Sequence, residues 1–134
     1  MADTMELRVI TPERVVFSGQ VEMVVARAVD GELGILPRHA PLVCVLRPGV
    51  LRAKQQRIEL RMAVSGGFMQ VRPDRVVILA DAAERADEID IARALAAKRR
   101  AEERLRSQRG DIDHARAKAA LERAIARLRA AGEM

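Results

Sequence analysis

Apolar residues in the first 80 positions recur in short segments that favour β-strands. In residues 5–10, MELRVI, apolar and polar residues alternate, which places Leu7 and Val9 on one face of a strand. Further segments rich in β-branched residues follow at 21–29, 42–46, 58–64 and 76–79. Turn-forming residues separate these segments at short intervals, a pattern that predicts a β-sandwich or a β-barrel.

Two turn signals carry specific expectations. Pro48-Gly49 suits the two central positions of a type II turn, because proline fixes the first φ and glycine tolerates a positive second φ. Gly66-Gly67 suits either a tight turn or a β-bulge where a Cβ atom would clash.

The pattern becomes that of α-helices from Asp87 onward, where the chain is mostly Ala, Arg, Glu, Leu and Ile and contains no proline. Asp87 or Asp90 can cap a helix start, while Gly110 suits a helix end and Asp111 a second start. The two predicted helices cover about 89–106 and 111–131.

The apolar faces of both predicted helices are rich in alanine. The expected face of the first helix holds Ile89, Ala92, Leu95 or Ala96, and Leu105. That of the second holds Ala117, Leu121, Ala124, Leu128 and Ala131. Each alanine in place of leucine removes roughly 2 kcal/mol of possible burial. We therefore expect a hairpin that is held weakly and can open.

Charged residues are distributed unevenly between the two parts of the chain. Residues 1–89 carry 12 basic and 12 acidic side chains, whereas residues 90–134 carry 12 basic and 7 acidic ones, so the whole net charge of +5 lies in the second part. Of the 24 basic residues, 21 are arginines, which favour bidentate contacts to phosphate or carboxylate. This asymmetry favours an acidic partner or ligand for the predicted hairpin.

Several classes of protein find little support in the sequence. The apolar run at 76–80 is too short to span a bilayer, and no secretory signal is evident, so we expect a soluble protein in a reducing compartment. Cys44, the single cysteine, is expected to be a small buried hydrophobe. His39 is expected to lie in a turn and not to bind a metal, because no acidic cluster accompanies it.

Three segments, GELGILPRHAPLV (31–43), AVSGGFMQVRPDRVVILADAAERADEIDIARA (63–94) and SQRGDID (107–113), resemble the epsilon subunit of bacterial F-type ATP synthases. The match runs nearly end to end. It implies an α+β fold in two parts, an antiparallel β-sandwich of two five-stranded sheets at 1–86 and an α-helical hairpin at 87–134.

The resemblance also implies a non-catalytic rotor subunit at the cytoplasmic face of the cell membrane. The sandwich would bind the gamma subunit and the c-ring, with Glu32 and His39 as interface candidates. The hairpin would either fold on the sandwich or extend along gamma. Extended, it would contact acidic segments of the beta subunits, with Arg116 among its contacts, and inhibit ATP hydrolysis.

IDIARA (89–94) looks like the motif by which epsilon subunits of some bacilli bind ATP in the folded state. Carried over position by position, the implied ATP contacts are Glu84, Asp90, Arg93, Ala94, Arg100, Arg123 and Arg127. ATP would be a regulatory ligand, and the site itself requires no metal. Helical spacing agrees with this set, because Arg93 and Arg100 share a face, as do Arg123 and Arg127.

Alternatives to ATP binding stay open. The arginines could serve the acidic beta segments alone, Asp90 could act only as a helix cap, and Arg99 could exchange roles with Arg100. A face of i,i+4 ion pairs is disfavoured, because Ser107 and Ala126 follow Glu103 and Glu122 at that spacing. A nucleic-acid-binding module would need aromatic stacking platforms, which this chain lacks, and an enzyme would need a nucleophile with a base.

Overall fold

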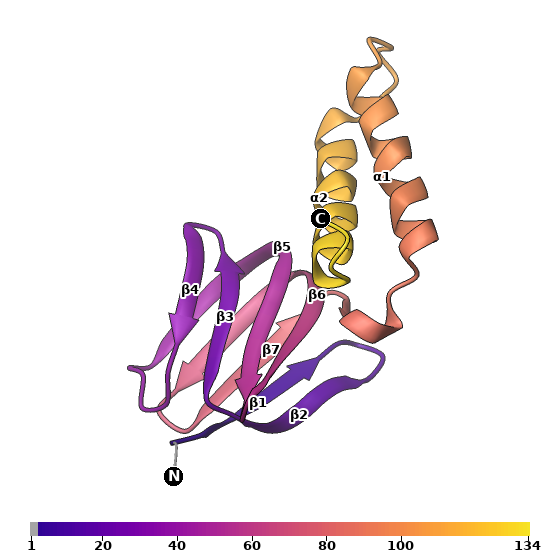
Figure 1. Cartoon of the computed structure of the whole chain (residues 1–134). Helices are drawn as coiled ribbons and strands as arrows, with labels where there is room; N and C mark the ends of the chain where they lie inside the picture. The colour runs from indigo at the N-terminus through magenta and orange to yellow at the C-terminus, as the bar shows by residue number, and fades with distance from the viewer. Residues whose placement is uncertain (1–2) are drawn as a thin grey trace.

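The computed structural model describes residues 3–134 and places a β-sandwich beside a pair of α-helices (Figure 1). The strands are β1 (Met5–Ile10), β2 (Val15–Val21), β3 (Met23–Ala28), β4 (Gly31–Ile35), β5 (Leu42–Gln55), β6 (Ile58–Arg72), β7 (Arg75–Ala80) and β8 (Ala83–Arg85). The helices are the short 3₁₀ helix η1 (Ala86–Glu88), α1 (Ile91–Arg106) and α2 (His114–Ala130). The two-part α+β fold expected from the sequence is therefore confirmed.

The sandwich is one continuously hydrogen-bonded sheet that folds into two layers. One layer runs β4-β3-β5-β6-β8 and uses the second half of β5 and the first half of β6. The other runs β2-β1-β7-β6-β5 and uses the remaining halves of the two long strands. Pairing is antiparallel except between β1 and β7, which are parallel. β5 and β6 therefore belong to both layers.

The expected type II turn at Pro48-Gly49 is wrong, because β5 continues through both residues. Pro48 pairs with Ser65 and Leu46 with Gly67, so the long hairpin bends here while it passes from one layer to the other. Neither the tight turn nor the bulge expected at Gly66-Gly67 forms, because β6 continues through both residues in unbroken register with β5, but the expected Cβ clash is present. A Cβ atom on Gly67 would lie 2.1 Å from the carbonyl oxygen of Leu79, and its φ of +133° favours glycine, so only glycine fits this bend.

Alternation along the strands builds the core between the layers. Leu7 and Val9 of β1 are fully buried, as predicted, and they join other fully buried residues of the sandwich such as Met62 and Ile78. Phe17 is buried, but Phe68 is 54% exposed. Cys44 is only partly buried, which corrects the expectation for this residue, and desolvation raises the pKa of its thiol.

Both helices begin at an aspartate cap. Asp90 Oδ1 accepts a hydrogen bond of 3.0 Å from the backbone N–H of Arg93, as the sequence suggested. The second cap is Asp113 and not Asp111, because Asp113 Oδ1 accepts from the N–H of Arg116. The first helix ends at the cap Ser107, three residues before Gly110.

The buried face of α1 differs from the predicted one. Ala94 and Ala101 are the buried residues of this helix, whereas Ala92 and Leu95 are exposed. The prediction followed the larger side chain of Leu95, but an alanine seam allows α1 and α2 to approach closely. On α2 the expected face is correct, with Ala117, Ala124 and Leu128 buried and Leu121 and Ala131 half-buried.

The hairpin contacts the sandwich mainly through α2, which packs on β5 and β6, while α1 packs on α2 (Figure 1). A small apolar cluster joins the two parts: Ile89, Ala130 and Ala63 of β6 are buried together, with Val50 and Ala131 beside them. Residues 85–90, which we call the connecting segment, lead from β8 into α1. The first of them is fixed to the sandwich, since Arg85 Nε donates to the carbonyl oxygen of Val16 at 2.9 Å.

Candidate functional site

A groove between α1 and α2 collects most of the arginines singled out in the sequence. We call it the interhelical groove; it has a volume of about 250 Å³, and its walls are Ala97, Arg100, Ala101, Arg104, Ala120, Arg123, Ala124 and Arg127. The four alanines keep the floor shallow, while the four guanidinium groups come from both helices. Such a set repels itself unless an anion neutralises it.

Glu84 of β8 is the carboxylate that reaches this groove from the sandwich. Its Oε2 accepts a hydrogen bond of 3.2 Å from Arg127 Nη2, and its Oε1 lies 2.8 Å from Arg127 Nε. The Nε contact is an ion pair without hydrogen-bond geometry, so Nε stays buried without a hydrogen-bond acceptor. Arg127 is therefore held against Glu84 through two of its nitrogens, so an incoming anion would have to share or displace this carboxylate.

The other predicted ligand contacts lie at the start of α1. Arg93 is exposed and does not line the interhelical groove, so it lies outside the group of four arginines there. Ala94 is fully buried, and Asp90 uses its side chain as the helix cap. Arg104, which the sequence analysis did not single out, is the fourth arginine of the groove. It lies one helical turn after Arg100, so the helical spacing could have predicted that the two share a face.

Ion pairs along the helices are fewer than the number of charges suggests. Lys98 and Glu102 form an i,i+4 pair of 3.5 Å, a spacing that the sequence reading overlooked. Glu122 of α2 instead pairs with Arg47 of β5 at 3.2 Å, and so helps to hold the hairpin on the sandwich.

The three interface candidates lie apart from one another. Glu32 of β4 pairs with Arg52 at 3.1 Å. His39 is exposed, and its Nδ1 lies 2.8 Å from the carbonyl oxygen of Ala40. Arg116 is exposed in the first turn of α2, near the far end of the hairpin.

An exposed apolar row, which the sequence reading missed, crosses the outer face of the second layer. Direct cross-strand pairs link its members from β5 through β6, β7 and β1 to β2. In that order they are Val45, Phe68, Leu79, Ile10 and Val15. All but Ile10 are about half exposed. The sequence does contain a signal for this exposed row, since β6 and β7 each have apolar residues on both faces of the strand.

An ion pair whose two side chains both have shifted pKa values joins the turn between β1 and β2 to the connecting segment. Arg14 Nη2 lies 3.0 Å from Glu88 Oε2, and Glu88 also accepts from the backbone N–H of Arg85. The hydrogen bond from Arg14, and after it the one from the Arg85 N–H, lowers the pKa of Glu88, while the hydrogen bond to Glu88 raises the pKa of Arg14.

Within residues 3–134, no three His, Cys, Asp or Glu side chains are grouped so as to hold a metal ion. No helix in this part of the chain is long and apolar enough to cross a membrane.

Comparison with known proteins identifies both parts of the chain. Residues 4–86 match the β-sandwich domain of the ATP synthase delta/epsilon chain, and residues 87–132 match its long α-helix domain. The chain is 58% identical over 108 residues to the ATP synthase epsilon chain of Desulforamulus reducens, which covers 81% of this chain and 82% of that one. It is 55% identical over 135 residues to the epsilon chain of Symbiobacterium thermophilum, covering 100% and 96%.

Solved structures agree with this assignment. A chain in the mitochondrial ATP synthase of Euglena gracilis, solved as OSCP, F1 and c-ring, superposes with a TM-score of 0.82 at 25% identity, over 96% of this chain and 81% of that one. A chain in the central stalk and c-ring of the Tetrahymena thermophila enzyme shares the fold, with a TM-score of 0.62 at 16% identity, over 97% and 98%. This chain therefore belongs to the bacterial epsilon-chain family of ATP synthase, as a structural and regulatory subunit and not a catalytic one.

Proposed function

We propose that this epsilon chain works in the rotor stalk, where it couples proton flow to ATP synthesis and inhibits ATP hydrolysis through its hairpin. In the proposal the hairpin folded on the sandwich is the permissive state, and bound ATP stabilises it. The observation that carries the proposal is the interhelical groove, where four arginines from both helices meet.

The sandwich is proposed to bind gamma through the exposed apolar row, because a contiguous apolar surface rimmed by polar residues is typical of a protein interface. Glu32 and His39, outside that row, are proposed to face the c-ring. This arrangement would hold the chain at the cytoplasmic face of the membrane as a peripheral subunit.

ATP is proposed to place its phosphates among Arg100, Arg123 and Arg127, while Asp90 and Arg93 would serve the nucleoside end together with the backbone at Ala94. Glu84 already partners Arg127, so the phosphates must share or displace this carboxylate. A ligand that binds only the folded hairpin stabilises it by RT ln(1 + [L]/Kd), about 2.7 kcal/mol at a hundredfold excess over Kd. High ATP would thus keep the hairpin folded.

At low ATP the hairpin would extend and bring arginines of α2 to acidic segments of the beta subunits. Arg116, Arg123 and Arg127 are the proposed contacts. Two of the three also line the interhelical groove, so ATP and the beta subunits would compete for the same side chains.

The experiment is calorimetry of ATP on the isolated chain, with and without a Mg²⁺ chelator. Arg100→Gln should weaken binding about tenfold, about 1.4 kcal/mol. Its neighbour Arg99→Gln, which removes the same charge outside the groove, should bind like the wild type. Arg93→Lys keeps the charge but loses the bidentate fork, and should also bind more weakly.

Absence of binding at millimolar ATP, or equal losses for Arg99→Gln and Arg100→Gln, would leave an epsilon chain whose hairpin responds to the beta subunits without sensing ATP. A strict requirement for Mg²⁺ would overturn the proposal that the site needs no metal.

A further inference from the structure

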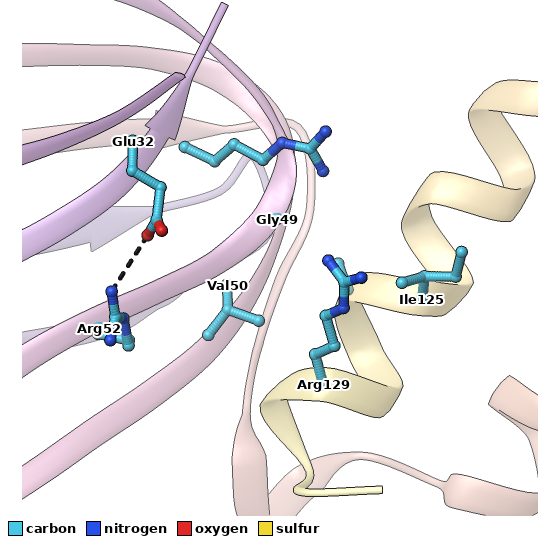
Figure 2. Close-up of a pocket in the computed structure, with 8 residues that line it drawn as sticks. Glu32, Gly49, Val50, Arg52, Ile125 and Arg129 are labelled. Carbon is cyan, nitrogen blue, oxygen red and sulfur yellow. Dashed lines mark hydrogen bonds and ion pairs between the residues drawn. The ribbon is translucent and has the colours of Figure 1, made fainter. Parts of the chain in front are cut away.

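A second cationic groove lies between the sandwich and α2, away from the interhelical groove. We call it the sandwich–helix groove; it has a volume of about 350 Å³ and is lined by Arg27, Glu32, Gly49, Val50, Arg52, Ile125, Ala126 and Arg129. Figure 2 shows Arg129 on the side of α2 that faces the strand carrying Gly49 and Val50, with Glu32 and Arg52 farther along the sandwich. The two grooves share no lining residue.

The charges in this groove are not balanced. Three arginines, one each from β3, β5 and α2, face a single carboxylate, which gives the lining a formal charge of +2. Glu32 is paired with Arg52 at 3.1 Å. Arg27 donates to the carbonyl oxygen of Pro48 at 3.1 Å, a neutral partner. Among the described residues, no carboxylate lies within ion-pair distance of Arg27 or Arg129.

The chain also keeps Arg27 at the edge of the groove. A Cβ atom on Gly49 would lie 2.8 Å from two carbons of the Arg27 side chain, so the absence of a side chain at Gly49 lets Arg27 lie across the strand. Val50 and Ala126 add an apolar floor. The result is a compact cationic rim over a partly desolvated floor, where a charge-assisted hydrogen bond is stronger than in open water.

We propose that the sandwich–helix groove binds a small multivalent phosphate, either inorganic or the phosphate tail of a nucleotide. Guanidinium forks match the oxygens of phosphate in pairs, and an anion of two or more charges neutralises the excess of the lining. Because Arg129 comes from α2 while Arg27 and Arg52 come from the sandwich, the site exists only when the hairpin is folded. Occupancy therefore holds the hairpin on the sandwich, independently of the interhelical groove.

The test uses the full chain and inorganic pyrophosphate, followed by NMR of backbone amides. Shifts at Gly49 and in the turn around Arg129 are expected at millimolar pyrophosphate. Arg129→Gln should weaken these shifts at least tenfold, and Arg129→Lys should weaken them less, because it keeps the charge. Lys118→Gln removes the same charge from an exposed position of α2 outside both grooves and should leave them unchanged.

A second titration uses ADP. If the natural ligand is the phosphate tail of a nucleotide, ADP should shift the same amides as pyrophosphate does. If the natural ligand is an inorganic phosphate, only pyrophosphate should shift them. Shifts confined to the interhelical groove, or no shift at all, would overturn this proposal and leave the ATP proposal intact. Equal weakening by Arg129→Gln and Lys118→Gln would also overturn it, because the attraction would then be due to the general positive charge of α2 and not to this groove.

Discussion

Replacing Ile89 by alanine should release the hairpin while leaving the sandwich folded. Ile89 is the largest side chain in the cluster that joins the two parts, where its buried partners are Ala63 and Ala130. It is only 9% exposed, and it directly precedes the cap of α1, so it anchors the hairpin where the hairpin begins.

The magnitude follows from the atoms removed. Ile89→Ala deletes three carbons, each worth about 0.8 kcal/mol of burial, so the lost burial alone costs about 2.5 kcal/mol, before any cost of the remaining cavity. The alanines around it cannot replace this area. Loss of 2.5 kcal/mol corresponds to an increase of about 60-fold in the population of the undocked hairpin.

Native-state hydrogen exchange of backbone amides measures this population. Helices of the length of α1 and α2 are marginal in water without tertiary contacts, so undocking exposes their amides. Exchange of α2 amides should accelerate about 60-fold, whereas amides of β1, β6 and β7 should keep their wild-type rates. Leu95→Ala is the matched control, because Leu95 lies on α1 with 40% exposure and should change α2 exchange little.

Unchanged exchange of α2 in Ile89→Ala would mean that the ion pairs Arg47–Glu122 and Arg127–Glu84 hold the hairpin, and the apolar cluster does not. Equal acceleration in the sandwich would mean that the two parts unfold together, which contradicts a mobile hairpin on a stable support.

Four further predictions concern the rest of the chain. A chain truncated after Ala86 should keep a cooperative thermal transition and bind gamma, while a synthase containing it should lose epsilon-dependent inhibition; persistent inhibition would refute this division. Inhibition should fall, and lose its sensitivity to salt, when alanine replaces the proposed beta contacts Arg116, Arg123 and Arg127. Glu88→Gln should destabilise the chain above the ordinary carboxyl pKa of 4.5, and its difference from wild type should vanish as pH falls through the lowered pKa of Glu88, as pH-dependent melts would show. Gly67→Ala should cost about 3 kcal/mol in urea unfolding, because φ is positive and the added Cβ meets backbone.

Much of this architecture could be predicted from the sequence because period and composition are local properties. The alternation in residues 5–10 and the alanine-rich, proline-free segment after Asp87 identified strand and helix without reference to neighbours. The course of β5 could not be predicted in this way. Pro48-Gly49 is a strong local turn signal, but pairing of β5 with β6 on both sides outweighs it, and such pairing is a property of the whole sheet.

The candidate site shows the same division. Helical spacing was enough to group Arg123 with Arg127, but the relative rotation of two alanine-faced helices decides which arginines of α1 join them. Alanine marks a buried face only weakly, so the sequence did not identify Arg104 as a residue of the groove. The role of Glu84 as partner of Arg127 depends on β8 pairing with β6, a contact between residues far apart in the sequence.

The passage of β5 and β6 through both layers has a mechanical consequence. In a sandwich of two separate sheets, the layers meet only through side chains and can slide under load. Here any sliding would have to stretch or break peptide hydrogen bonds along the longest hairpin of the molecule, close to the bend at Gly67. A shearing force on the apolar outer face is thus carried to the opposite layer by covalent chain and hydrogen bonds, so that a load turning one layer turns the other with it.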